Sequence, residues 1–190
     1  PSKITVIEYE SFGGCTKLKS IKLPEGITTI SGYSFVSNNE LCEINWPENL
    51  ASIQTRAFQY CFSLSSIRFN NKLRKIETNS FESCLRLESV KFPDSLEIIQ
   101  SYAFNLCRYL QSIEIPPKID GIYSFCFSEC RNLKSIRLND RISFIQEYAF
   151  YSCCHLESIK YPKNCSVVSN RAFSGCEQLK KITLQEGVKT

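Results

Sequence analysis

The chain has 190 residues, of which 43% are hydrophobic and 22% are charged, and its formal net charge is +4. This is ordinary globular composition, and so small a net charge predicts no nucleic-acid partner. No apolar run is long enough to cross a bilayer, so we expect no direct membrane insertion in this segment. The sequence lacks methionine even at position 1, which favours an excerpt of a longer protein.

A phenylalanine recurs every 23 residues without one insertion, and we number it position 0 of a repeat. The eight phenylalanines are Phe12, Phe35, Phe58, Phe81, Phe104, Phe127, Phe150 and Phe173. Position 6 is leucine in all eight repeats, and position 3 is cysteine in all but the second, which has Asn38. Self-similarity at a fixed period is the signature of a solenoid of stacked units.

Each repeat predicts three elements in chain order, as the first repeat illustrates. Residues 20–23 alternate polar and apolar side chains, which indicates a short strand that Pro24 ends, because proline lacks the amide a strand requires. A second extended segment follows, with Ile27 and Ile30 pointing inward. A small residue, the phenylalanine, the cysteine and the leucine then recur three to four residues apart, which predicts a short helical or 3-10 turn.

One 23-residue coil cannot bury its own apolar face, so the coils must stack. Stacking sets each residue beside its equivalent in the next coil, with neighbouring strands parallel and about 4.8 Å apart. The sequence therefore predicts an α/β repeat solenoid. We expect a single domain over residues 1–190, built of about eight repeats and excerpted from a longer array.

Two motifs carry a family resemblance: C-x-x-L-x-x-I-x-L-P at residues 15–24 and I-x-x-x-A-F-x-x-C-x-x-L at residues 99–110. The repeat resembles the BspA-like, or Treponema pallidum-type, leucine-rich repeats of bacterial surface proteins and trichomonads, over the whole chain. The resemblance implies a right-handed coil with short parallel strands on its concave face. It also implies adhesion or recognition of a host or partner protein, and it favours the cell surface or secretion.

The eleven cysteines suggest a disulfide framework or a metal site, but seven share position 3, where a free cysteine acts as a small buried apolar residue. Stacked side chains at this position lie too far apart for usual disulfide geometry, so we predict mostly free thiols. Off this position, we expect Cys165 in the core and Cys42 and Cys154 at the surface. No C-x-x-C pair is present, and we predict no metal site.

No motif for catalysis or phosphate binding occurs in the sequence. The single histidine, His155, adjoins Cys154 in a loop, but a nucleophilic pair requires side chains that face each other in a cleft. We therefore predict no catalytic residue, no cofactor and no enzymatic activity.

Positions 8 and 10 are the exposed strand positions, and position 8 is mostly serine. Position 10 is basic in five of eight repeats: Lys22, Arg68, Lys91, Arg137 and Lys160. Stacking aligns these residues, which we call the basic strip, along one face, where they could bind a protein with an acidic surface. Alternatively, the strip is a solvated strand face whose charges only discourage edge association.

Apolar residues at loop positions that are polar in most other repeats form a second candidate surface, the loop patch. Its members are Tyr60, Phe62, Leu85, Leu106, Tyr109 and Tyr151. Exposed apolar clusters often mark contacts, and Phe62 and Tyr109 are the candidate binding residues here. Alternatively, these side chains pack against neighbouring coils.

The favoured function is a non-catalytic protein-binding module for adhesion or recognition. The alternative is an intracellular structural or scaffold protein, because free thiols suit a reducing cytoplasm. A signal peptide or membrane anchor in the full-length gene would distinguish the two.

Overall fold

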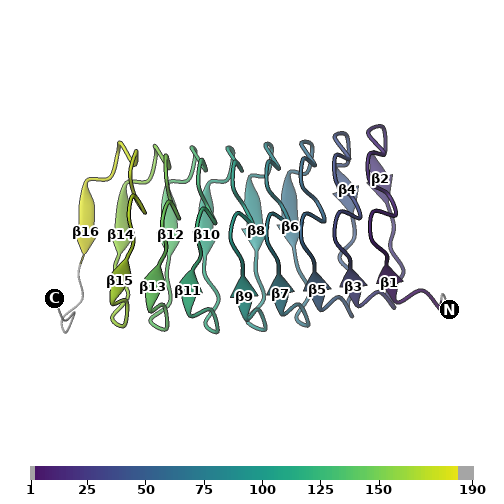
Figure 1. Ribbon diagram of the computed structural model, residues 1–190, viewed down its shortest axis with the longest axis horizontal. Coiled ribbons are helices and arrows are strands. Elements are labelled where there is room, and N and C mark those ends of the chain that lie inside the picture. Colours follow the sequence, from purple (N-terminus) through teal and green to yellow (C-terminus); the bar gives the residue numbers. More distant parts are fainter. Residues whose placement is uncertain (1–2, 184–190) are drawn as a thin grey trace.

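The structure, a computed structural model, describes residues 3–183 as a row of stacked coils that runs from the N-terminal to the C-terminal end (Figure 1). Residues 1–2 and 184–190, at the ends of the predicted domain, lie outside the described part. The coils repeat every 23 residues, as the spacing of the phenylalanines predicts, and together they form a parallel-strand solenoid of about eight turns.

Each coil contributes two short strands. One set, at positions 8–10, comprises β2 (Ser20–Ile21), β4 (Glu43–Ile44), β6 (Ser66–Arg68), β8 (Ser89–Lys91), β10 (Ser112–Glu114), β12 (Ser135–Arg137), β14 (Ser158–Lys160) and β16 (Lys181–Thr183). The other set, at positions 17–18, comprises β1 (Val6–Ile7), β3 (Thr29–Ile30), β5 (Ser52–Ile53), β7 (Lys75–Ile76), β9 (Ile98–Ile99), β11 (Gly121–Ile122), β13 (Phe144–Ile145) and β15 (Val167–Val168).

The strand pairs are parallel and join residues 23 apart, as in Arg68 with Lys91 and Ile53 with Ile76. Each set is interrupted once in the described residues. The first set forms a two-stranded sheet, β2–β4, and a six-stranded sheet from β6 to β16. The second set forms a five-stranded sheet from β1 to β9 and a three-stranded sheet from β11 to β15.

The expected helical or 3-10 turn, and with it the α part of the α/β class, is wrong: residues 3–183 contain no helix. In the turn around each phenylalanine, alternate backbone amides donate to a carbonyl of the same turn and to a carbonyl of the next coil. In the third coil, the amides of Ala57, Gln59 and Cys61 donate to carbonyls three residues back. The amides of Arg56 and Phe58 donate to carbonyls of the next coil. A helix needs consecutive amides bonded within one segment, so this alternation excludes it.

The same turn contains two residues with positive φ in each coil, at positions −2 and +2. In the third coil these are Arg56 (φ 58°) and Tyr60 (φ 63°), and only Gly14 and Gly175 supply glycine at such a place. Non-glycine residues adopt this conformation at a cost, so the surrounding structure must hold them there. The bonds to the next coil provide that constraint.

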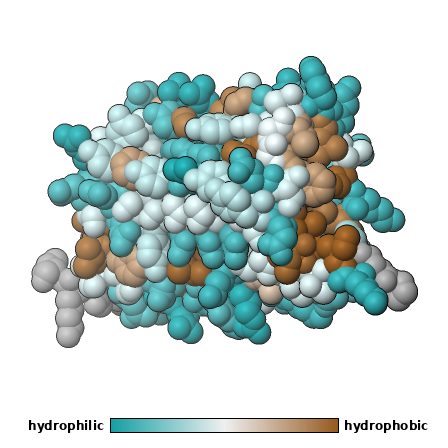
Figure 2. All heavy atoms as spheres, turned by 45° about the vertical axis from the view of Figure 1, so that its right-hand side comes forward, coloured by the Kyte–Doolittle hydropathy of each residue, from teal (hydrophilic) through white to brown (hydrophobic). Residues whose placement is uncertain are grey.

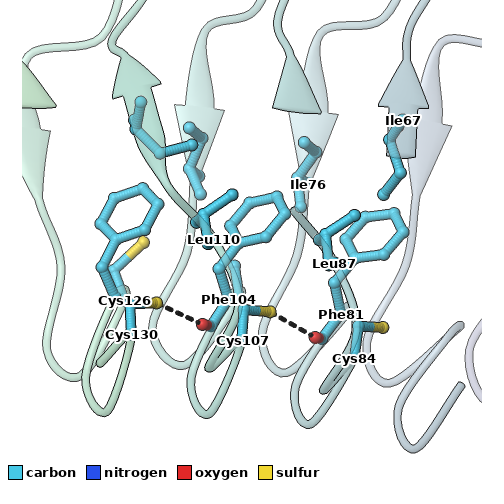
Figure 3. Close-up of a cluster of buried hydrophobic side chains, with 14 of the residues drawn as sticks. Ile67, Ile76, Phe81, Cys84, Leu87, Phe104, Cys107, Leu110, Cys126 and Cys130 are labelled. Carbon is cyan, nitrogen blue, oxygen red and sulfur yellow. Dashed lines mark hydrogen bonds between the residues drawn. The ribbon is translucent and has the colours of Figure 1, made fainter. Parts of the chain in front are cut away.

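The core consists of like residues stacked along the array. Phenylalanine rings one coil apart are nearly parallel, with centroids 5.1 Å apart for Phe35 and Phe58 and 5.3 Å apart for Phe81 and Phe104. Figure 3 shows the rings of Phe81 and Phe104 beside the equivalent leucines, Leu87 and Leu110. Phenylalanines of the six inner coils are fully buried, so each adds a large apolar area to the core.

Candidate functional site

The basic strip lies on the first set of strands, where side chains alternate outward and inward. In β6, β12 and β14 the flanking residues are exposed and the central isoleucine is buried. The five residues of the strip are all exposed. Register pairing aligns Arg68 with Lys91, and Ser66 with Ser89, so each basic side chain adjoins a small serine on its own strand. Arg68 and Lys91 are therefore aligned, as stacking predicts.

The charges along position 10 follow a definite order. From β6 to β14 they are Arg68, Lys91, Glu114, Arg137 and Lys160, so one carboxylate lies between two basic pairs. Glu114 forms an ion pair with Arg137 at 3.2 Å, and both side chains are largely exposed. Such a pair contributes little to folding, because water screens it.

Lys22 lies apart from the rest of the strip, because the first set of strands is interrupted between β4 and β6. The Asn45 side chain bonds to both backbone groups of Leu23: its Oδ1 accepts from the amide at 2.6 Å and its Nδ2 donates to the carbonyl at 2.9 Å. This side chain thus continues the contact between the first two coils just beyond the paired residues Ile21 and Ile44. An open hollow of about 500 Å³ lies beside this interruption and is lined in part by Lys22, Glu43 and Ser66.

The loop patch is only partly exposed. Tyr60 and Tyr109 are 40% and 53% exposed, whereas Phe62 and the other members are half-buried. Phe62 packs edge-on against Tyr60, with ring centroids 6.1 Å apart. Figure 2 shows the larger apolar patches toward the N-terminal coils, on the right, and smaller ones along the lower edge.

The cysteines at position 3 form a regular series of hydrogen bonds. Each thiol from Cys61 onward donates to the phenylalanine carbonyl of the preceding coil, as Cys107 does to Phe81 at 3.3 Å (Figure 3). Asn38 fills the same role with its amide, which donates to the carbonyl of Phe12 at 3.0 Å. Position 3 therefore selects a small donor that links two coils.

All eleven cysteines are free thiols in the structure, as the sequence predicts for most of them. Cys165 is buried and Cys42 is exposed, as expected, whereas Cys154 is half-buried. Burial raises the pKa of Cys61 to about 12 and that of Cys107 well above its usual value. These buried thiols stay protonated at neutral pH, so they are structural donors and not nucleophiles.

Cys154 and His155 both bond to backbone. The Cys154 thiol donates to the carbonyl of Ser152 at 3.3 Å, and His155 Nδ1 lies 2.8 Å from the carbonyl of Arg131. Within residues 3–183, no three cysteine, histidine or acidic side chains are grouped so that they could hold a metal ion. The same residues include no helix long and apolar enough to span a membrane.

Sequence reasoning missed a second series of bonds between coils, at position 19. Gln54 Oε1 accepts the amide of Gly32 at 3.2 Å, and Gln100 Oε1 accepts that of Thr78 at 3.1 Å. Glu77 and Gln146 accept amides in the same way. The signal was available, because the residue at this position is glutamine or glutamate in five repeats: Glu8, Gln54, Glu77, Gln100 and Gln146.

These coils, with parallel strands and stacked leucines, define a leucine-rich-repeat solenoid. The family model for the BspA type leucine rich repeat region matches residues 1–111 and 74–190, with six copies, so the chain belongs to that family. No curated protein matches the sequence significantly.

The structure is similar to three solved bacterial leucine-rich-repeat proteins. The Treponema pallidum protein is 27% identical with a TM-score of 0.75, and the match covers 94% of this chain and 75% of that one. A Bacteroides ovatus protein (22%, TM-score 0.63) matches over 98% and 66%, and one from Eubacterium ventriosum (22%, TM-score 0.72) over 90% and 46%. The last two show the fold alone, and the chain spans less than two thirds of each.

Proposed function

We propose that this chain is a non-catalytic protein-binding module that recognises an acidic protein surface through the basic strip. The observation that carries the proposal is the alignment of exposed basic residues along one strand face, which follows from the 23-residue register. The family is one of repeat scaffolds suited to protein interaction. Adhesion or recognition at the cell surface is the favoured setting, because the family includes repeats of bacterial surface proteins.

Charge reversal on the strip tests the proposal. The double variant Arg68→Glu/Lys160→Glu should slow association with the partner about tenfold at low salt and weaken its salt dependence, because aligned charges steer an approaching molecule. Stability should change by less than about 1 kcal/mol, since both side chains are exposed. Stopped-flow or surface-plasmon-resonance association rates, measured on a partner found by cross-linking on the native cell, give the readout.

A matched control reverses the same charge elsewhere. Lys75, on the second set of strands, and Arg141, in the turn after β12, are also exposed, so Lys75→Glu/Arg141→Glu should leave association nearly unchanged. If the strip variant also associates normally while Phe62→Ser/Tyr109→Ser abolishes binding, the loop patch is the binding surface and the proposal is wrong.

The free thiols favour a second candidate, an intracellular scaffold, because reducing compartments keep cysteines unpaired. Blocking thiols rapidly in native cells, followed by mass spectrometry, separates the two settings. Oxidised or disulfide-bonded Cys42 points to an oxidising compartment, and uniformly reduced cysteines point to the cytoplasm.

A further inference from the structure

Position 10 carries a defined order of charges and is not uniformly basic. Between β6 and β14, position 10 reads positive, positive, negative, positive, positive, with Glu114 in the centre. A uniformly acidic partner would bring one carboxylate against Glu114. The best complement carries acid, acid, base, acid, acid, and this order is the same in either direction.

The spacing of the strip limits the kind of chain that can supply this order. Strands one coil apart lie about 4.8 Å apart, and the stacked phenylalanine rings are 5.1 to 5.7 Å apart. An α-helix advances about 5.4 Å per turn, so one side chain per turn stays within about 2 Å of register over four steps. An extended strand advances about 6.7 Å per side chain on one face, so over four steps its side chains would fall out of register with the strip by about one coil.

The small side chains at position 8, beside the strip, leave room for a helix. Position 8 is serine in the five coils from β6 to β14, and these serines are exposed beside the longer charged side chains. Small side chains allow a helix to approach closely, while flexible lysine and arginine side chains absorb the remaining mismatch in spacing.

We propose that the strip binds an α-helix of the partner lying along the solenoid axis, with acidic residues on the turns facing Arg68, Lys91, Arg137 and Lys160. A basic residue on the central turn faces Glu114. This inference rests on the proposed function and specifies the partner's surface.

Synthetic helical peptides test the inference directly. The matched peptide carries Glu, Glu, Lys, Glu, Glu at positions 1, 5, 8, 12 and 15 of an alanine-rich helix, which places one per turn. A shuffled peptide of the same composition carries the lysine at position 1. A third peptide keeps the matched order but contains two prolines that abolish the helix. The matched peptide should bind at least about fivefold more tightly than either control, by fluorescence anisotropy.

A single substitution in the protein should reverse which peptide binds more tightly. Glu114→Lys places a fifth positive charge at the centre, so a peptide with glutamate at all five positions should then bind more tightly than the matched one. Glu147→Lys makes the same charge change in the turn after β13, where Glu147 is also exposed, and should leave the order of preference unchanged.

The outcomes separate this inference from the proposed function. If the native partner loses binding to Arg68→Glu/Lys160→Glu but the shuffled or proline-containing peptide binds as well as the matched one, the strip binds the partner and the helix inference is wrong. If neither the partner nor any peptide responds to the strip variant, the proposed function fails as well.

Discussion

At Gly121, the neighbouring coil requires the absence of a side chain. A Cβ atom there would lie 2.0 Å from the Phe144 ring, which packs over the glycine from the paired strand β13. Gly121→Ala should therefore lower the free energy of unfolding by about 1–3 kcal/mol through overpacking. Denaturant unfolding measures the loss. In a Phe144→Ala background the same substitution should cost much less, and an equal cost in both backgrounds would contradict this account.

The buried thiols predict a loss of stability in alkali. The unfolded chain releases thiol protons near about pH 8.5, whereas burial holds the proton of Cys61 to about pH 12 and raises the pKa of Cys84 and Cys107 in the same direction. The folded state thus binds more protons in this range. Stability should be constant below about pH 8.5 and fall above it by up to about 1.4 kcal/mol per pH unit for each thiol.

A serine variant isolates this effect. Cys61→Ser/Cys107→Ser retains a small donor for the phenylalanine carbonyls but does not titrate in this range. Its free energy of unfolding, measured by denaturant titration from pH 7 to 10.5, should decline less steeply than that of the native protein. If the free energy of unfolding declines equally steeply with pH in both proteins, the cysteines at position 3 do not cause the loss of stability in alkali.

At the scale of the element, the strands were predictable and the turn was not. Alternation of polar and apolar residues specifies a strand such as β6, and Ile67 lies inward as expected. The spacing of Ala57, Phe58, Cys61 and Leu64 is compatible with a helical turn and equally compatible with two successive tight turns. What decides between them is the bonding of alternate amides to the next coil, which a pattern within one repeat does not encode.

The candidate site was likewise predictable only in part. The repeat period places Arg68 and Lys91 side by side, as the register confirms. The interruption between β4 and β6, which separates Lys22 from the rest of the strip, was not predictable, because the 23-residue pattern continues through it unchanged. Whether the strip or the loop patch binds a partner remains a prediction.

At the scale of the whole molecule, stability should depend on the number of neighbours a coil has. Leu110 is fully buried between two coils, whereas Leu18, at the same position of the first repeat, is only half-buried. Leu110→Ala should cost about 2–5 kcal/mol, as should removal of buried Ile113, and Leu18→Ala distinctly less. Equal losses at Leu110 and Leu18, measured by denaturant unfolding, would argue against additive stacking.

The constant register also restricts how the gene can change in length. One added or lost residue in a middle coil would change the 23-residue separation of every pair that spans it, so such insertions should be poorly tolerated. Removing residues 82–104 would join Phe81 to Asn105, keep every repeat position in phase and shorten the array by one coil. Recombination between repeats can therefore lengthen or shorten the protein in steps of 23 residues. Each step would add or remove one position-10 residue, charged in most coils, so variation in length is also variation in recognition.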